Sequence, residues 1–167
     1  RKLFGFIIVI LLLGILLCGA QTKYLEKCKW DIIDATGDVT PRHESSMVVC
    51  KNKFYLIGGR GINPVNVFNP ESNTWEAKSK TPLEMHHFQA VSYKGVIYVI
   101  AMTGKYPRET PLPNIWLYYP ETDTWKKGPE IPENRRRGGA GVSIYQDKIY
   151  ITCGIDFGHT SGTNNYF

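Results

Sequence analysis

Residues 66–75 read NVFNPESNTW, and residues 116–125 read WLYYPETDTW, fifty positions further along the 167-residue chain. In both stretches an aromatic residue, a turn that starts with proline and an acidic residue, and a tryptophan recur at the same offsets. A period near 50 residues is typical of the blades of a β-propeller. Because such repeats build a scaffold and leave chemistry to the loops, they indicate the fold more directly than the function.

Two short apolar runs lie upstream of each repeated stretch, and a third pair follows the last one. The pairs cover residues 46–57, 89–100 and 141–153, and their two runs are separated by Lys-Asn, Lys-Gly and Gln-Asp. Val, Ile and Tyr suit a pleated, packed surface, and a two-residue break indicates a tight hairpin. No helical period runs through these stretches. The sequence therefore predicts an all-β fold, an incomplete β-propeller of about two and a half four-stranded blades.

The repeat also predicts the domain organisation. A partial propeller is expected over 21–167, with units at about 42–75, 86–125 and 137–167 and an outer strand at 24–33 around Trp30. In a closed propeller such a strand completes the last blade and removes an exposed edge. Propellers close with about four to eight blades, so we expect this chain to be a fragment of a longer protein.

With these residues the chain resembles the kelch-repeat family, of the exported type found in galactose-oxidase-like proteins, over residues 30–167. The matching residues are Tyr55, Gly58, Gly59, Phe68, Pro70 and Trp75, then Tyr98, Tyr118, Pro120 and Trp125, then Tyr150 and Gly154. The glycine pair becomes Ala101-Met102 in the second unit and Cys153-Gly154 in the third. Because glycine permits close backbone approach, the second blade is expected to widen or bulge there.

The N-terminus predicts export. Arg1 and Lys2 precede 18 uncharged, mostly apolar residues that end in Cys-Gly-Ala, as in a signal peptide. An uncleaved N-terminal anchor, or a lipoprotein attached through Cys18, is an alternative interpretation of residues 1–20. All three interpretations predict a secreted or extracytoplasmic propeller, which meets a membrane only through this segment.

The net charge bears on nucleic-acid binding, and the cysteine content bears on disulfide bonds. Without Arg1 and Lys2 the chain carries 18 basic and 15 acidic residues, a balance too mild to indicate nucleic acid. Cys28, Cys50 and Cys153 would remain after cleavage. Cys50 and Cys153 fall in different blades, so we expect buried small apolar residues rather than a bridge between them.

A possible binding site follows from the hairpin geometry. The first strand of an antiparallel pair begins at the rim where the second strand ends, so residues flanking each hairpin share one face. The polar residues predicted on this rim are Arg42, His43, Arg60, His86, His87, Thr103, Lys105, Arg136, Arg137, Asp156 and His159. Arginine and histidine suit anionic or polyhydroxylated ligands such as acidic sugars. The resemblance also implies a purely structural role for arginines that precede the inner strand.

No metal or other cofactor is expected. His86 and His87 are adjacent, and in a strand their rings would point to opposite faces, which disfavours a shared metal. Motifs of zinc peptidases, serine hydrolases and P-loop proteins are absent from the sequence, and no catalytic residue is assigned. The glycine-rich stretch 138–141 leads into a strand, so it is interpreted as a close backbone approach and not as a phosphate cradle.

The sequence favours an exported interaction scaffold for a glycan or a protein. The alternative that the resemblance implies is a carbohydrate-active enzyme of the galactose-oxidase or sialic-acid-epimerase type, with Asp156 and His159 as candidate acid and base. A third possibility, an intracellular ubiquitin-ligase adaptor, conflicts with the predicted export leader.

Overall fold

The computed structural model describes residues 29–158, which excludes the predicted leader at 1–20 and the candidate residue His159. The chain divides into two compact units at Ile33 and Asp34, and every strand assigned in the described range belongs to the second unit. Within that range no helix has the length and apolar character needed to cross a membrane.

The first blade is an antiparallel sheet whose four strands follow one another in chain order. They are β1 (Ser45–Cys50), β2 (Lys53–Gly58), β3 (Pro64–Asn69) and β4 (Thr74–Lys80). Lys51 and Asn52, which join β1 to β2, have φ values of 48° and 62°. Positive φ at both central residues is the mark of the type I′ turn, whose twist matches that of paired strands.

The second blade repeats this arrangement with one insertion. Its sheet contains β5 (Val91–Tyr93), β6 (Val96–Val99), β9 (Asn114–Tyr119) and β10 (Thr124–Glu130). Between β6 and β9 lies a separate short hairpin, β7 (Met102–Thr103) and β8 (Thr110–Pro111). A 3₁₀ turn, η1 (Glu133–Arg135), leads to the third unit, β11 (Gly141–Tyr145) and β12 (Lys148–Thr152).

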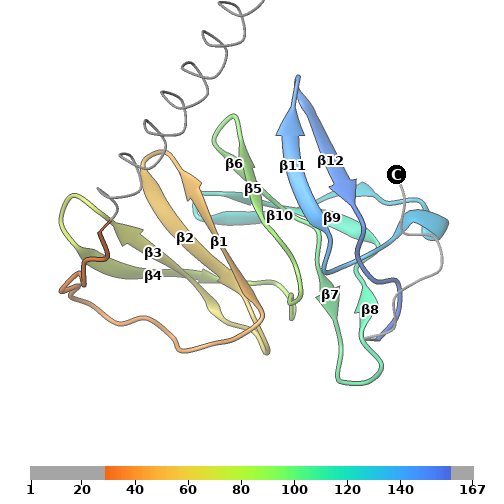
Figure 1. Ribbon diagram of the computed structural model, residues 1–167, viewed down its shortest axis with the longest axis horizontal. Helices are drawn as coiled ribbons and strands as arrows, with labels where there is room; N and C mark the ends of the chain where they lie inside the picture. The colour runs from red at the N-terminus through yellow and green to blue at the C-terminus, as the bar shows by residue number, and fades with distance from the viewer. Residues whose placement is uncertain (1–28, 159–167) are drawn as a thin grey trace, which may run out of the picture. The chain divides into compact units, whose positions relative to one another are not determined.

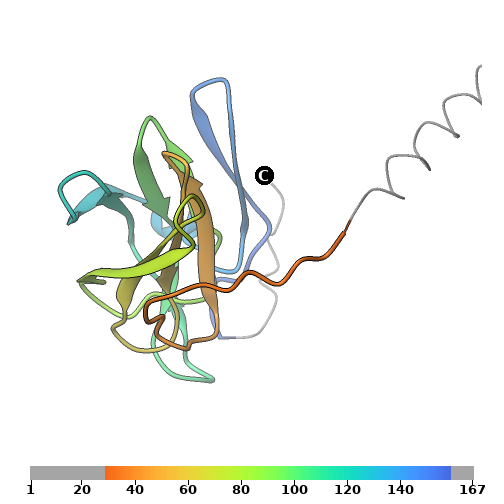
Figure 2. The same ribbon diagram turned by 90° about the vertical axis from the view of Figure 1, so that its left-hand side faces the viewer.

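Two four-stranded sheets and the β11–β12 hairpin of the third unit confirm the predicted all-β architecture of about two and a half blades. Figures 1 and 2 show the sheets as separate ribbons that follow one another, and the inner strand β5 contacts both β1 and β11. The outer strands β4 and β10 run past the predicted ends at 75 and 125. Of the predicted outer strand at 24–33, the described part, 29–33, contains no strand, and Thr36 bridges to Thr74 instead.

The two repeated tryptophans occupy equivalent surroundings, as the period predicts. Trp75 packs on Phe68 with ring centroids 5.0 Å apart, and Trp125 packs on Tyr118 at 4.9 Å. Inside the sheets, the buried core includes Tyr55, Ile57, Val67, Ile97, Val99 and Tyr118. Burial of these side chains supplies the main force that holds successive blades together.

Repeated hydrogen bonds link each blade to the next. The Ser46 hydroxyl accepts from the Ala90 amide at 2.8 Å, and the Gln89 side chain, at the same repeat position, accepts from the Val142 amide at 3.2 Å. Next to them, the backbone amide of His87 donates to the Glu44 carbonyl at 3.2 Å. Such linked inner strands fix the loops that precede them.

The glycine-pair positions differ between units, as the sequence suggests. Gly58 and Gly59 have φ values of 71° and 97°, and Cys153 and Gly154 keep this conformation at 58° and 95°. In the second unit, Ala101 and Met102 do not have this positive-φ conformation. There β6 ends at Val99 and the chain continues into the β7–β8 hairpin. A widening or bulge is predicted at this point, whereas the structure has a break in the strand.

The expectation that the cysteines are buried holds for one of the two described. Cys50 is 2% exposed within the core. For Cys153 the prediction is wrong, since this residue is exposed. It lies in the turn just after β12, beyond the last residue paired with β11, so no sheet covers its thiol.

Candidate functional site

The rim predicted from the hairpins exists in the structure. Ser45 at the start of β1 pairs with Gly58 at the end of β2, and Gly141 at the start of β11 pairs with Thr152 at the end of β12. The loops before β1, β5 and β11 and those after β2, β6 and β12 form what is called here the mouth rim.

Two of the predicted rim arginines brace the backbone. Nη1 of Arg42 donates to the carbonyls of Gly58 at 3.2 Å and Pro64 at 2.8 Å. Nη1 of Arg137, in the equivalent position of the third unit, donates to the Cys153 carbonyl at 3.0 Å. Each arginine thereby holds the end of the second strand of its hairpin, which is the structural role that the resemblance implies.

Three other candidates have separate local partners or are exposed. Arg136 pairs with Glu130, the last residue of β10, at 2.7 Å, and its Nε donates to the Ile131 carbonyl at 3.1 Å. His43 is largely exposed, with Nδ1 3.4 Å from the Glu44 carboxylate. Asp156 is exposed on the segment after β12. None of the contacts described for these three residues joins one of them to another.

Arg60 and His86 do meet, in a polar cluster between the first two blades. Arg60 contacts Glu44 at 2.5 Å through Nε, Glu109 at 2.7 Å through Nη2, and the Gly104 carbonyl at 2.8 Å through Nη1. Nη1 also lies 3.2 Å from Nε2 of His86. The side chains of Glu109 and His86 are fully buried. The contact with Glu109 and, despite burial, that with Glu44 raise the pKa of Arg60.

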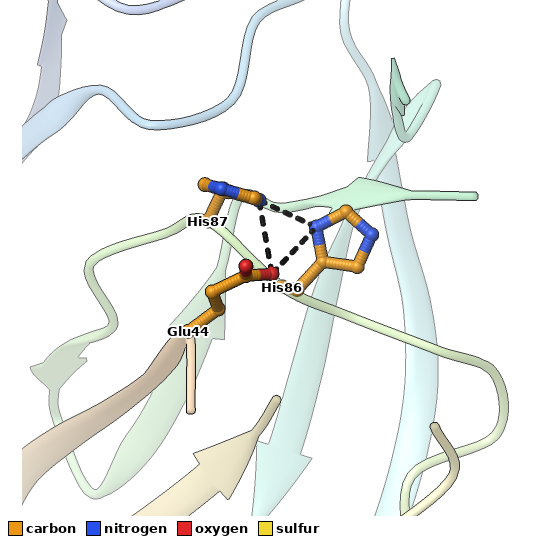
Figure 3. A group of neighbouring side chains, drawn as sticks. All are labelled: Glu44, His86 and His87. Carbon is orange, nitrogen blue, oxygen red and sulfur yellow. Dashed lines mark hydrogen bonds and ion pairs between the residues drawn. The ribbon is translucent and has the colours of Figure 1, made fainter. Parts of the chain in front are cut away.

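Glu44, His86 and His87 turn their polar atoms toward one another (Figure 3). The Nδ1 atoms of His86 and His87 are 2.8 Å apart. Oε2 of Glu44 lies 3.4 Å from Nδ1 of His87 and 4.0 Å from Nδ1 of His86. The prediction that the histidine rings point to opposite faces is wrong. It assumes a regular strand, whereas His86 makes an isolated bridge and His87 has a φ of 47°.

Burial acts to raise the pKa of the Glu44 carboxyl. The opposing effects of Arg60, His87 and His43 outweigh it and hold this pKa below its ordinary value. Glu44 is therefore a carboxylate at neutral pH.

Sequence reasoning missed the acidic members of the cluster. Glu109 lies on the inserted β7–β8 hairpin, and Glu84 lies 3.5 Å from Nε2 of His86. Glu44 occupies the repeat position of His87 and shares its positive φ, 59° against 47°. The alignment of the three units was the available signal, because it places Glu44 and His87 at the same point of successive blades.

Three rim loops present one large apolar side chain each. Ile62 follows β2, Tyr106 lies between β7 and β8, and Phe157 follows β12; they are 56%, 71% and 52% exposed. Together they are called the loop patch. Hydrogen bonds connect these loops. Arg60 donates to the Gly104 carbonyl, and the Gly158 amide donates to the Glu109 carbonyl at 2.8 Å. Lys105 and Arg108 flank Tyr106 and are exposed.

Comparison with known proteins agrees with the repeat. Residues 41–82 match a family model described as Kelch motif. Kelch-like protein 35 of Mus musculus is 28% identical over 134 residues, which are 76% of this chain and 21% of that protein. Kelch-like protein terF of Aspergillus terreus is 26% identical over 145 residues, 77% of this chain and 31% of that protein.

Among solved structures, that of YjhT matches with a TM-score of 0.62 and 16% identity, covering 74% of this chain and 36% of YjhT. This similarity shows the fold. The chain spans between about a fifth and a third of the length of the two curated relatives, so what those whole proteins do is not carried over from these matches.

Proposed function

We propose that this kelch-repeat propeller domain, distantly related to the kelch-like proteins, is an interaction scaffold that binds a protein or a glycan through its loop patch. The proposal includes export, which the leader predicted at 1–20 supports. It needs no catalytic residue, since affinity comes from side chains that loops present on a fixed scaffold.

The observation that carries the proposal is the exposure of Ile62, Tyr106 and Phe157 on linked loops of three successive units. Aromatic side chains in contact surfaces give a large share of binding energy, because they bury much area at little cost in conformational entropy. Lys105 and Arg108 add positive charge beside Tyr106. The patch therefore suits a ligand with an apolar or ring-shaped face next to an acidic group, a description that fits an acidic protein segment or an acidic sugar.

The enzyme hypothesis has no comparable support within residues 29–158. Arg42 and Arg137 are engaged by backbone carbonyls and so do not converge on a ligand carboxylate. Asp156, the candidate acid, is exposed, and its proposed partner His159 lies outside the described residues. An epimerase requires a paired acid and base. No such pair is assigned within residues 29–158.

The test compares Tyr106→Ala with Tyr145→Ala on the secreted protein. Tyr145 is 62% exposed at the hairpin end of β11, away from the mouth rim, so it is a matched control for losing an exposed ring. Binding is measured on a glycan array and by affinity enrichment from extracellular proteins. We expect ligand retention to fall about tenfold or more in Tyr106→Ala and to persist in Tyr145→Ala. Equal retention by both variants, or no ligand with either method, would remove the proposal.

A further inference from the structure

The separations of the Glu44, His86 and His87 ligand atoms match those around a small metal ion. Zinc binds histidine nitrogen and carboxylate oxygen at about 2.0–2.2 Å in a tetrahedral arrangement, which places ligand atoms about 3.3–3.5 Å apart. The three observed separations are 2.8, 3.4 and 4.0 Å. A small rotation of the rings within this spread brings all three atoms to bonding distance of one ion.

Two acceptors near His86 favour the tautomer that a metal requires. Its Nε2 lies 2.9 Å from the Gly104 carbonyl oxygen and 3.5 Å from the Glu84 carboxylate, which both accept hydrogen bonds, whereas the donor Nη1 of Arg60 lies 3.2 Å away. The shortest of these contacts places the proton on Nε2, so that the lone pair on Nδ1 faces His87 and Glu44. A histidine ligand commonly donates its second ring nitrogen to a backbone carbonyl in this way, which fixes the ring orientation.

Glu44 supplies the carboxylate oxygen of the cluster. Its Oε2 is buried and lies 2.5 Å from Nε of Arg60, with which it forms an ion pair. Arg60 opposes a second cation at this place, and its contact with Glu109 at 2.7 Å offsets that charge.

The backbone holds the ligands in place before any ion binds. The His87 amide donates to the Glu44 carbonyl, and His86 exchanges two backbone hydrogen bonds with Met102 at 3.0 and 2.9 Å. The side chains of Glu44 and His87 retain 25% and 20% exposure, so an ion can reach the cluster from solvent. Pre-organised ligands with an entry path are the features that a genuine metal site needs.

We propose that Glu44, His86 and His87 form a site for one divalent zinc-type cation, with its remaining coordination position open to solvent. The site joins the start of β1 to the segment before β5, so the bound ion links the first two blades. This inference goes beyond the binding function proposed above and does not depend on it.

The test measures Zn²⁺ binding by calorimetry to the untagged protein after dialysis against a chelator. We expect one equivalent per chain for the unsubstituted protein. Glu44→Gln and His87→Asn should weaken binding at least tenfold, while Glu130→Gln should bind normally. Glu130 is the matched control because its exposed carboxylate lies outside the cluster.

A second measurement needs no substitution and so does not depend on the variants folding. Long-range ¹H–¹⁵N spectra of the histidine rings should show Zn²⁺ shifting the Nδ1 resonances of two histidines while Nε2 of His86 stays protonated. Absence of saturable uptake would overturn the proposal. Uptake that is the same in all variants, or that leaves both Nδ1 resonances unmoved, would likewise overturn it, since it would place zinc on other surface groups.

Discussion

The outer two units and the middle unit brace the same rim in different ways. In the first and third units an arginine before the inner strand, Arg42 or Arg137, donates to the carbonyl at the end of the neighbouring strand. In the second unit the equivalent residue is Met85, which is fully buried. There Arg60 reaches across from the first blade to the Gly104 carbonyl, accompanied by the buried carboxylate of Glu109.

This difference shows why the polar cluster lies where it does. In the first hairpin, Arg42 donates to uncharged acceptors, the carbonyls of Gly58 and Pro64 and the side-chain oxygen of Asn66. Between the blades, Arg60 contacts Glu109, a fully buried carboxylate that needs a cation as its partner. The second solution therefore brings Arg60 and Glu109 together with His86, next to the Glu44 and His87 side chains.

The largest effect is expected from breaking the brace between blades. Arg60→Ala removes the guanidinium that contacts the fully buried Glu109, and loss of one partner of a buried ion pair costs about 3–5 kcal/mol. Denaturant unfolding would give the change in free energy. Lys78→Ala is the control, because its pair with the exposed Glu76 should contribute under about 1 kcal/mol. Similar losses in both variants would contradict the distinction.

An intermediate effect is expected from the brace within the first hairpin. Arg42→Ala leaves the carbonyls of Gly58 and Pro64 without this charged donor, for an expected loss of about 2–3 kcal/mol in unfolding free energy. Arg108→Ala, at an exposed position, should change stability by no more than about 0.5 kcal/mol. If thermal or denaturant unfolding did not separate the two variants, Arg42 would not be a brace.

The smallest effect concerns acid stability at a second contact between these blades. Asp123 accepts hydrogen bonds from the Ser79 amide and hydroxyl and from the Tyr118 hydroxyl at 2.7–3.0 Å. Burial acts to raise the pKa of Asp123, but these bonds hold it below its ordinary value of 3.8.

The unfolded chain therefore binds more protons than the folded one as the pH falls through that range. The Asp123 contribution is present above pH 3.8 and is lost as the pH drops through the lowered folded pKa. Asp123→Asn should cost about 1 kcal/mol at pH 7 and flatten this acid-induced loss. Urea unfolding at several pH values would test it, and an unchanged pH slope in the variant would argue against the link.

Sequence patterns predict the blades well because strands and tight turns depend on residues that are close together in the sequence. The two-residue breaks at Lys51-Asn52 and Gln146-Asp147 do form tight turns with positive φ, and the repeated tryptophans at 75 and 125 pack alike. The hairpin argument also places Arg60 and His86 on the same rim. These conclusions need only strand period, turn length and antiparallel geometry.

The cluster itself could not be predicted in this way. Arg60 and Glu109 are 49 positions apart and meet only because a hairpin is inserted where the second unit lacks its glycine pair. The converging rings of His86 and His87 depend on a left-handed backbone at His87, which hydrogen-bonds to Glu44 of the preceding blade. Contacts between blades set both features, and no local pattern encodes them.

A double-mutant cycle between Arg60 and Glu109 tests the brace between blades most directly. The unfolding free energies of Arg60→Ala, Glu109→Gln and the double variant are compared with that of the unsubstituted protein. If the two side chains act as one buried unit, the losses will fall short of additivity by about 2 kcal/mol or more. Losses that add to within about 0.5 kcal/mol would show that Arg60 does not brace the second blade through Glu109.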